Sequence, residues 1–333
     1  MCVRKNMDSF IFAISAVAPI IIMVALGYFL KRIGIVKKEL AKPLNRLVFT
    51  TLLPVLLFKN IYDIESISSI RIGYILFAVA MTLIFFFLAL FLCHFSTDKK
   101  NRRGVLVQAV FRSNYALIGI PLAESLYGEG GSALATILMA VIVPLFNVLA
   151  VIALALYSEE DGQKISIKKI ALDIVKNPLI IGICVGAIAL LVRYLFTLGG
   201  IEFRLSDITP VWKVVGYLAS SATPLALIIL GVQFEFSAMS QTKRELIWAV
   251  LLRCVAVPVI ALTTAYLLFD FSGAEFATFV AVFATPIAVS SVPMAQEMKG
   301  DAELCGQIVI LTTLVSGFTI FLYVFILKSI GVF

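Results

Sequence analysis

The sequence predicts an all-α integral membrane protein whose ten transmembrane helices form two inverted repeats of five, with the fourth and ninth helices broken. Three observations predict this fold class. The 333-residue chain is 61% hydrophobic, with a mean hydropathy of +1.06, whereas a soluble protein has roughly 45–50% apolar residues. Its apolar residues form runs that are each long enough to cross a bilayer. One segment in the first half of the chain is repeated in the second half.

The expected elements follow from the length of a transmembrane helix, which needs about 20 mostly apolar residues. The first apolar run follows Arg4 and Lys5 as a signal peptide would, but it is too long and continues into further basic residues, so we expect it to remain a helix. The first repeat is predicted to cover residues 8–157, a cytoplasmic linker residues 158–169, and the second repeat residues 170–333. The helices are expected at residues 10–31, 39–60, 71–95, 104–127, 132–157, 170–196, 208–235, 245–269, 274–297 and 304–328.

The internal repeat is visible in two segments that align without a gap, Val110–Glu129 and Val282–Asp301, 172 residues apart. Pro54 and Pro224 make a second match at a spacing of 170 residues. Because each half holds an odd number of spans, the second copy must be inverted in the membrane. The identical pairs in the two segments are Val110/Val282, Phe111/Phe283, Ala116/Ala288, Pro121/Pro293, Ala123/Ala295 and Gly128/Gly300.

The charged residues lie in the loops. The net charge of +7 could suit nucleic acid, but the basic residues lie in short loops between apolar runs, so no nucleic-acid partner is expected. With the N-terminus outside, fourteen Lys and Arg fall in cytoplasmic loops and eight fall outside, which favours a multi-pass protein of the cytoplasmic membrane with both termini outside. The five cysteines lack metal-ligand spacing and His94 is the only histidine, so we expect neither a metal site nor a cofactor.

Polar and helix-breaking residues interrupt the fourth and ninth spans. Inside a bilayer, irregular backbone is tolerated only where protein or a water-filled cavity surrounds it. We expect regular hydrogen bonding to be lost near Ala116–Pro121 and Pro286–Pro293, where amides at half-helix ends would favour anions and carbonyls would favour cations. Two proline kinks without a ligand are the alternative. The candidate residues are Ser113, Asn114, Tyr115, Gly119 and Pro121 in the fourth span, and Thr285, Pro286, Ser290, Ser291 and Pro293 in the ninth.

Arg112 places a positive charge inside the fourth span, about 12 Å deep at 1.5 Å per residue. A central arginine costs about 2.5–3.5 kcal/mol on insertion scales, and such charges usually face a cavity or a partner. One interpretation is a ligand for a carboxylate, whose two oxygens fit the guanidinium fork. The alternative is a structural pair with an acid or with carbonyls, or snorkelling to the cytoplasmic side. Arg253 in the eighth span has the same two interpretations.

The chain carries Asn114-x-x-x-x-Gly119-Ile120-Pro121-Leu122, the Pro54 helix, Thr223-Pro224-Leu225 with Gly231, and Pro286 through Ala295-Gln296-Glu297 followed by Leu304. In these features it resembles the auxin efflux carrier family, which includes bacterial organic-acid permeases and the plant PIN proteins. The resemblance implies two inverted five-helix repeats, with broken fourth and ninth helices that cross at the substrate site. It also implies a scaffold of the first, second, sixth and seventh helices that supports a moving transport part. Because polar groups at that depth need partners, we expect Asn114 to face the crossing, with Thr285, Ser290 and Ser291 close by.

The chain departs from the family in two ways. Many members have Asn-x-Gly where this chain has Asn114-Tyr115-Ala116, which changes the size of the pocket near Tyr115. About a dozen residues replace the long cytoplasmic loop of many plant members. Auxin as the substrate, and regulation through that loop, are therefore not transferred to this chain.

The residues and the resemblance together predict a secondary transporter of small organic anions, either mono- or dicarboxylates, that works by elevator-type alternating access. Its expected partners are the anion, membrane lipid, a proton or a sodium ion as coupling ion, and a second copy in a homodimer. The alternatives are a sodium-coupled organic-anion symporter of the bile-acid type and a membrane sensor that keeps the transporter fold without moving substrate. An intramembrane enzyme is disfavoured, because the sequence has no paired intramembrane aspartates and no HExxH motif.

Overall fold

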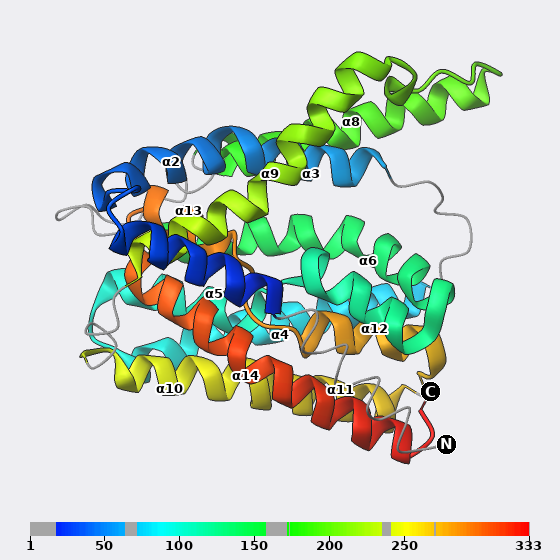
Figure 1. Cartoon of the computed structure of the whole chain (residues 1–333). Coiled ribbons are helices and arrows are strands. Elements are labelled where there is room, and N and C mark those ends of the chain that lie inside the picture. Colours follow the sequence, from blue (N-terminus) through cyan, green and yellow to red (C-terminus); the bar gives the residue numbers. More distant parts are fainter. Residues whose placement is uncertain are drawn as a thin grey trace.

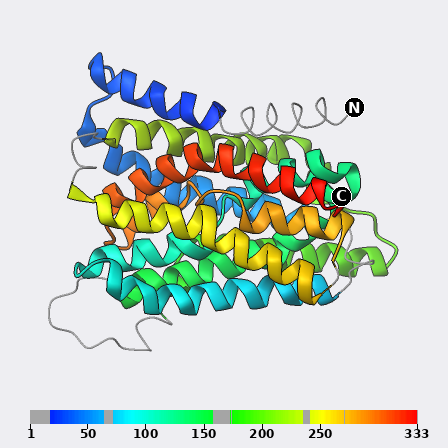
Figure 2. The same ribbon diagram turned by 90° about the horizontal axis from the view of Figure 1, so that it is seen from below.

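The computed structural model describes residues 18–63, 72–157, 172, 174–234, 241–269 and 271–332. The start of the first predicted helix and the predicted linker at residues 158–169 lie outside these ranges. Within them, seven helices are long and apolar enough to cross a membrane. In Figures 1 and 2 the long helices run side by side along one direction, as helices that cross the same bilayer do.

The first half of the described chain begins with a helix at residues 18–32. The elements that follow it are η1 (Lys38–Leu40), α2 (Ala41–Leu47), η2 (Val48–Leu52), α3 (Leu53–Tyr62), α4 (Ile72–Ser96), α5 (Lys100–Phe111), η3 (Tyr115–Gly119) and α6 (Ile120–Leu156). Helix α6 changes direction at Tyr127 and at Gly128, whose φ of 62° favours glycine. It therefore holds the end of the fourth predicted span and all of the fifth.

The second half of the described chain is also helical. Its elements are α8 (Pro178–Leu198), η4 (Leu205–Asp207), α9 (Thr209–Gln233), α10 (Lys243–Leu251), η6 (Leu252–Ala256), α11 (Val257–Leu268), α12 (Gly273–Phe283), α13 (Ser291–Glu297) and α14 (Ala302–Ser329). The predicted start of the sixth span, at residue 170, lies outside the described residues; residues 174–176 are helical, and a break follows. Asn177 leaves the helical conformation and accepts a hydrogen bond from the Leu179 amide, so the long helix begins at Pro178.

Three π-helical turns occur in the described residues, and each ends two residues before a proline. They are η2 before Pro54, η3 before Pro121 and η6 before Pro258. A proline lacks an N–H group and its ring clashes with the carbonyl four residues earlier. The wider π turn relieves that clash. The carbonyl freed before Pro258 is that of Cys254, which accepts a hydrogen bond from the Tyr323 hydroxyl at 2.9 Å.

Glycines bring four helices into close contact. A Cβ added to Gly27, in the helix of residues 18–32, would lie 2.0 Å from a backbone oxygen of α9. One added to Gly231 of α9 would lie equally close to the first helix. Gly182 and Gly186 of α8 pack in the same way on α3, where the carbonyl oxygen of Pro54 would lie 2.5 Å from a Cβ on Gly182. Small residues at such spacing allow close helix packing in membranes.

The remaining helices lie either on the opposite side of the molecule or in a middle layer. In Figure 1, α2, α3, α8 and much of α9 lie along the top, whereas α4, α10, α11, α12 and α14 lie toward the bottom. Phenylalanines join α4 to α12, with ring centroids 4.8 Å apart between Phe77 and Phe279. Helices α5, α6 and α13 lie between the two sides (Figure 1). This middle layer holds the candidate site.

Candidate functional site

Two helices stop at equivalent places in the middle layer. Helix α5 ends at Phe111, and the backbone then leaves the helical conformation as far as Asn114. Helix α12 ends at Phe283, and α13 begins only at Ser291. Phe111 and Phe283 are the same position of the sequence repeat. Regular hydrogen bonding was expected to be lost near Ala116–Pro121; the chain leaves the helix just before this range, at residues 112–114, and is π-helical at residues 115–119.

The two interrupted segments pair with each other. Ser113 and Ile287 form an isolated antiparallel bridge. The backbone N–H of Asn114 donates a hydrogen bond to the Pro286 carbonyl oxygen at 2.7 Å. Each segment thus supplies partners for backbone groups that the other leaves without helical hydrogen bonds, which is necessary inside a bilayer.

Arg253 holds the helix ends beside this pairing. Its guanidinium donates to the carbonyl oxygens of Val110 at 3.0 Å, Val282 at 3.0 Å and Thr285 at 2.8 Å. Val110 and Val282 are again equivalent positions, near the C-terminal ends of α5 and α12. The side chain is fully buried. The last carbonyls of a helix lack partners and carry partial negative charge, so this arginine satisfies and neutralises both ends. Its role is structural.

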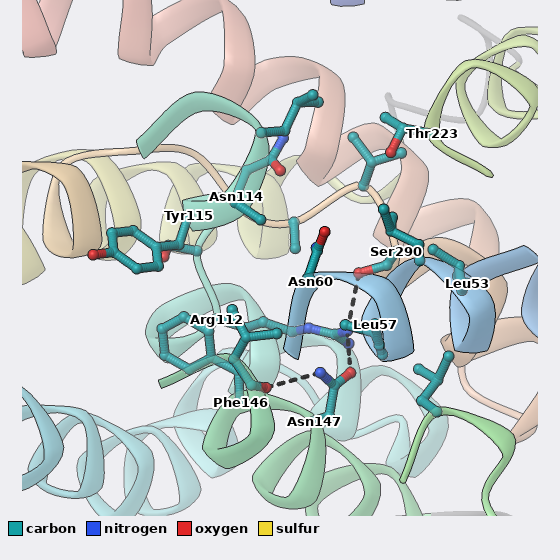
Figure 3. A pocket seen from close by; sticks show the side chains of 18 of the residues that line it. Leu53, Leu57, Asn60, Arg112, Asn114, Tyr115, Phe146, Asn147, Thr223 and Ser290 are labelled. Carbon is teal, nitrogen blue, oxygen red and sulfur yellow. Dashed lines mark hydrogen bonds between the residues drawn. The ribbon is translucent and has the colours of Figure 1, made fainter. Parts of the chain in front are cut away.

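A cavity of about 90 Å³ lies against the paired segments. Residues 112–117 and 288–290 form one side of it. Leu53, Leu57 and Asn60 of α3 and Thr223 of α9 line the other side. In Figure 3 the side chains of Asn60, Arg112 and Ser290 converge on this space from three separate segments.

Arg112 is the charged group of the cavity. Its guanidinium donates to Asn147 Oδ1 at 2.9 Å and Ser290 Oγ at 3.0 Å (Figure 3). It also donates to Gln108 Oε1 at 3.1 Å and Met294 Sδ at 2.9 Å. Only 2% of its surface is exposed. Every one of these partners is neutral, and no carboxylate pairs with Arg112 within the described ranges. A buried cation without a counter-ion is costly, so the cavity favours an anion.

Five of the eleven predicted site residues line the cavity: Arg112, Ser113, Asn114, Tyr115 and Ser290. Buried polar atoms of two of them, Ser113 Oγ and Asn114 Nδ2, have no hydrogen-bond partner in the structure. The Tyr115 hydroxyl donates instead to the Ala135 carbonyl at 2.8 Å. The cavity therefore presents a fixed cation, and two of its lining residues hold buried polar atoms without a partner.

The other predicted residues support the site without lining it. Gly119 makes room for the Tyr115 ring, because an added Cβ would lie 2.5 Å from Cδ2 of that ring. The Thr285 hydroxyl, just after the end of α12, donates to the Ala281 carbonyl oxygen in the last turn of that helix at 2.8 Å. Pro286 supplies the carbonyl that pairs with Asn114. Pro121, Ser291 and Pro293 lie within the helices that follow the interruptions.

Sequence reasoning missed three polar residues of the cavity, namely Asn60, Asn147 and Thr223. Asn147 is buried in α6, where it accepts from Arg112 and donates to the Val143 carbonyl at 2.8 Å. An asparagine in the middle of an apolar span was the available signal, because such residues usually face the protein interior. Asn60 follows Lys59 near the end of its span, and Thr223 stood out only through its neighbour Pro224, so neither residue pointed to the cavity.

Apolar helices around a buried cationic cavity define a multi-pass membrane protein with an internal polar site. The sequence model of one family, described as membrane transport protein, matches residues 12–324. The chain therefore belongs to this family, the auxin efflux carrier family, which confirms the resemblance. An uncharacterized transporter of Methanothermobacter thermautotrophicus is 25% identical over 302 residues, covering 90% of this chain and 93% of the relative. Another, from Methanocaldococcus jannaschii, is 25% identical over 320 residues, covering 93% and 97%.

Proposed function

We propose that this protein is a secondary transporter of small organic anions and that the cavity beside Arg112 is its substrate site. The observation that carries the proposal is a buried guanidinium that faces a cavity and has only neutral partners. A carboxylate bound there would complete the charge pair and take hydrogen bonds from the guanidinium in place of neutral partners such as Ser290. Membership of a transporter family and relatives named as transporters support the same class of function.

The proposed architecture is ten helices in two inverted repeats, with the interrupted helices crossing at the substrate. The equivalent ends of α5 and α12 support it, as does the pairing of the segments that follow them. Helix dipoles add to the site. The η3–α6 helix begins at the cavity, and the free amides of a first helical turn favour negative charge.

An elevator movement fits the packing. The helix of residues 18–32 and helices α3, α8 and α9 are joined through glycine contacts and would form the fixed scaffold. The interrupted helices would move with the rest. Side-chain hydrogen bonds join the two parts where Gln296 of α13 meets Asn45 of α2 at 2.7 Å and Gln233 of α9 at 2.9 Å. Such neutral contacts cost less to break than ion pairs would.

The basic residues support an orientation. The turns at residues 33–38, 97–99 and 298–301 lie at the left end of Figure 1, and residues 199–208 lie at the right. The left end carries more lysines and arginines in the described ranges, so we assign it to the cytoplasmic side. Both termini would then lie on the outer side of the cell membrane. A coupling proton or sodium ion, and a homodimer, remain part of the proposal.

The test is uptake by purified protein in proteoliposomes, with pyruvate, acetoacetate, malonate and oxalate as probes. Parallel runs with a sodium gradient and a proton gradient identify the coupling ion. Arg112→Lys keeps the charge but loses the fork, so affinity should fall by about 1.5–3 kcal/mol. Arg112→Ala should do more damage. Arg244→Lys, on an exposed side chain away from the cavity, is the matched control.

Folding must be checked separately, by the melting temperature of each variant. A well-folded Arg112→Ala protein that binds and transports these acids like wild type would remove Arg112 from the site. Uptake of no carboxylate by wild type, under any gradient, would favour a sensor that keeps the fold without moving substrate.

A further inference from the structure

We infer that the transported anion is a small molecule with one negative charge, whose other end is uncharged and accepts hydrogen bonds. This inference rests on the proposed function and narrows its substrate class. It follows from three properties of the cavity, which are its charge, its donors and its size.

The charge of the cavity is a single positive unit. Arg112 is the one charged side chain among the described residues that line it. The nearby cations are already engaged elsewhere. Arg253 binds three backbone carbonyls outside the lining, and Lys59, next to Asn60 in the sequence, pairs with Asp63. One carboxylate would neutralise the site, whereas a second would be a buried charge without a partner, which is strongly unfavourable.

The donors of the cavity point to an uncharged acceptor at the other end of the ligand. Asn114 lines the cavity, and its Nδ2 is buried without a hydrogen-bond partner in the structure. Asn60 and Thr223 add neutral polar groups on the opposite wall. A ketone, hydroxyl or amide oxygen can accept a hydrogen bond from an amide N–H without introducing charge. The groups between these positions, such as Leu53 and Leu57, are apolar and suit a short carbon chain.

The size of the cavity limits the ligand. Its volume of about 90 Å³ is small beside the ~300–1,000 Å³ of pockets that hold drug-sized molecules. Short 2-oxo, 3-oxo or hydroxy monocarboxylates combine one charge, one neutral acceptor and a short chain. We therefore expect the site to prefer them to dicarboxylates of the same size.

The experiment compares two pairs of acids that match in size and differ in charge: acetoacetate with malonate, and pyruvate with oxalate. Binding to the purified full-length protein is measured by calorimetry, and transport by uptake into proteoliposomes. At pH 7 we expect each monoanion to bind at least tenfold more tightly than its dianion. We also expect lactate to bind and its neutral amide, lactamide, to show no binding.

Engineered charge gives a second, independent readout. Asn60→Lys adds a cation to the opposite wall, so the ratio of malonate to acetoacetate affinity should rise at least tenfold. Lys59→Gln changes charge at the neighbouring position outside the cavity lining and should leave the ratio unchanged. If Asn60→Lys does not fold, the wild-type pairs still decide the question.

The outcomes separate this inference from the proposed function. Equal or tighter binding of malonate and oxalate would overturn the single-charge inference and leave an organic-anion transporter standing. Failure of every acid to bind or be transported would overturn both.

Discussion

Replacing Arg253 by lysine tests whether the guanidinium fork holds the two helix ends together. A lysine keeps the positive charge, but its single ammonium on a flexible stem cannot reach three carbonyls that converge from two helices and a loop. We expect two of the three carbonyls to lose their partner. Each buried carbonyl left without a partner costs about 1–3 kcal/mol of stability. The lower part of that range applies to membrane proteins, because the unfolded chain in the membrane also finds hydrogen-bond partners. The expected loss is therefore about 2–4 kcal/mol of unfolding free energy.

The assay is reversible unfolding of the purified protein, titrated from mild detergent into dodecyl sulfate. Arg244→Lys is the matched control, because that arginine is exposed and bonds to the single carbonyl of Phe95. Its unfolding free energy should stay within about 0.5 kcal/mol of wild type. If Arg253→Lys were as stable as this control, the carbonyl contacts would not secure the interrupted helices and our account of Arg253 would be refuted.

Two further predictions concern the cavity and the scaffold. Asn147→Asp places a carboxylate where Arg112 now donates to an amide oxygen at 2.9 Å, and this carboxylate would neutralise the guanidinium. Acetoacetate affinity, measured by calorimetry, should therefore fall at least tenfold while the melting temperature stays the same. Unchanged affinity would contradict an anion site. Gly231→Ala puts a methyl group 2.0 Å from a backbone oxygen, so unfolding free energy should fall by about 1–3 kcal/mol or more. Gly216 has open space around it, so Gly216→Ala should not lower the unfolding free energy. Equal losses of unfolding free energy in the two variants would contradict the packing argument.

Much of the fold could be predicted because apolar length alone marks a helix that spans a bilayer. The long helices α4, α9 and α14 begin and end within a few residues of the predicted runs. The sixth span was predicted as one continuous run from residue 170, whereas the structure interrupts it at Asn177, which caps the long helix that begins at Pro178. Periodicity of apolar residues does not report such a cap.

The location of the site could be predicted better than its details. Arg112 and Asn114 stand out because polar groups at that depth need a partner. The break was predicted near Ala116–Pro121, and the chain leaves the helix slightly earlier, at residues 112–114, because a π turn accommodates the proline. The contrast between Arg112 and Arg253 could not be predicted. Both are buried arginines in apolar spans, and only the tertiary structure shows which one meets carbonyls and which one faces a cavity.

The π turns have a consequence for comparing this chain with its relatives. Each turn at residues 48–52, 115–119 and 252–256 uses a hydrogen bond that spans one residue more than an α-helical bond. Deleting one residue there would restore an ordinary helix and keep the register on both sides. A relative that lacks the proline after one of these turns should therefore show a single-residue gap inside that transmembrane helix, whereas a relative that keeps the proline should align there without a gap. An alignment that allows gaps only in loops would misplace every residue between such a turn and the next loop.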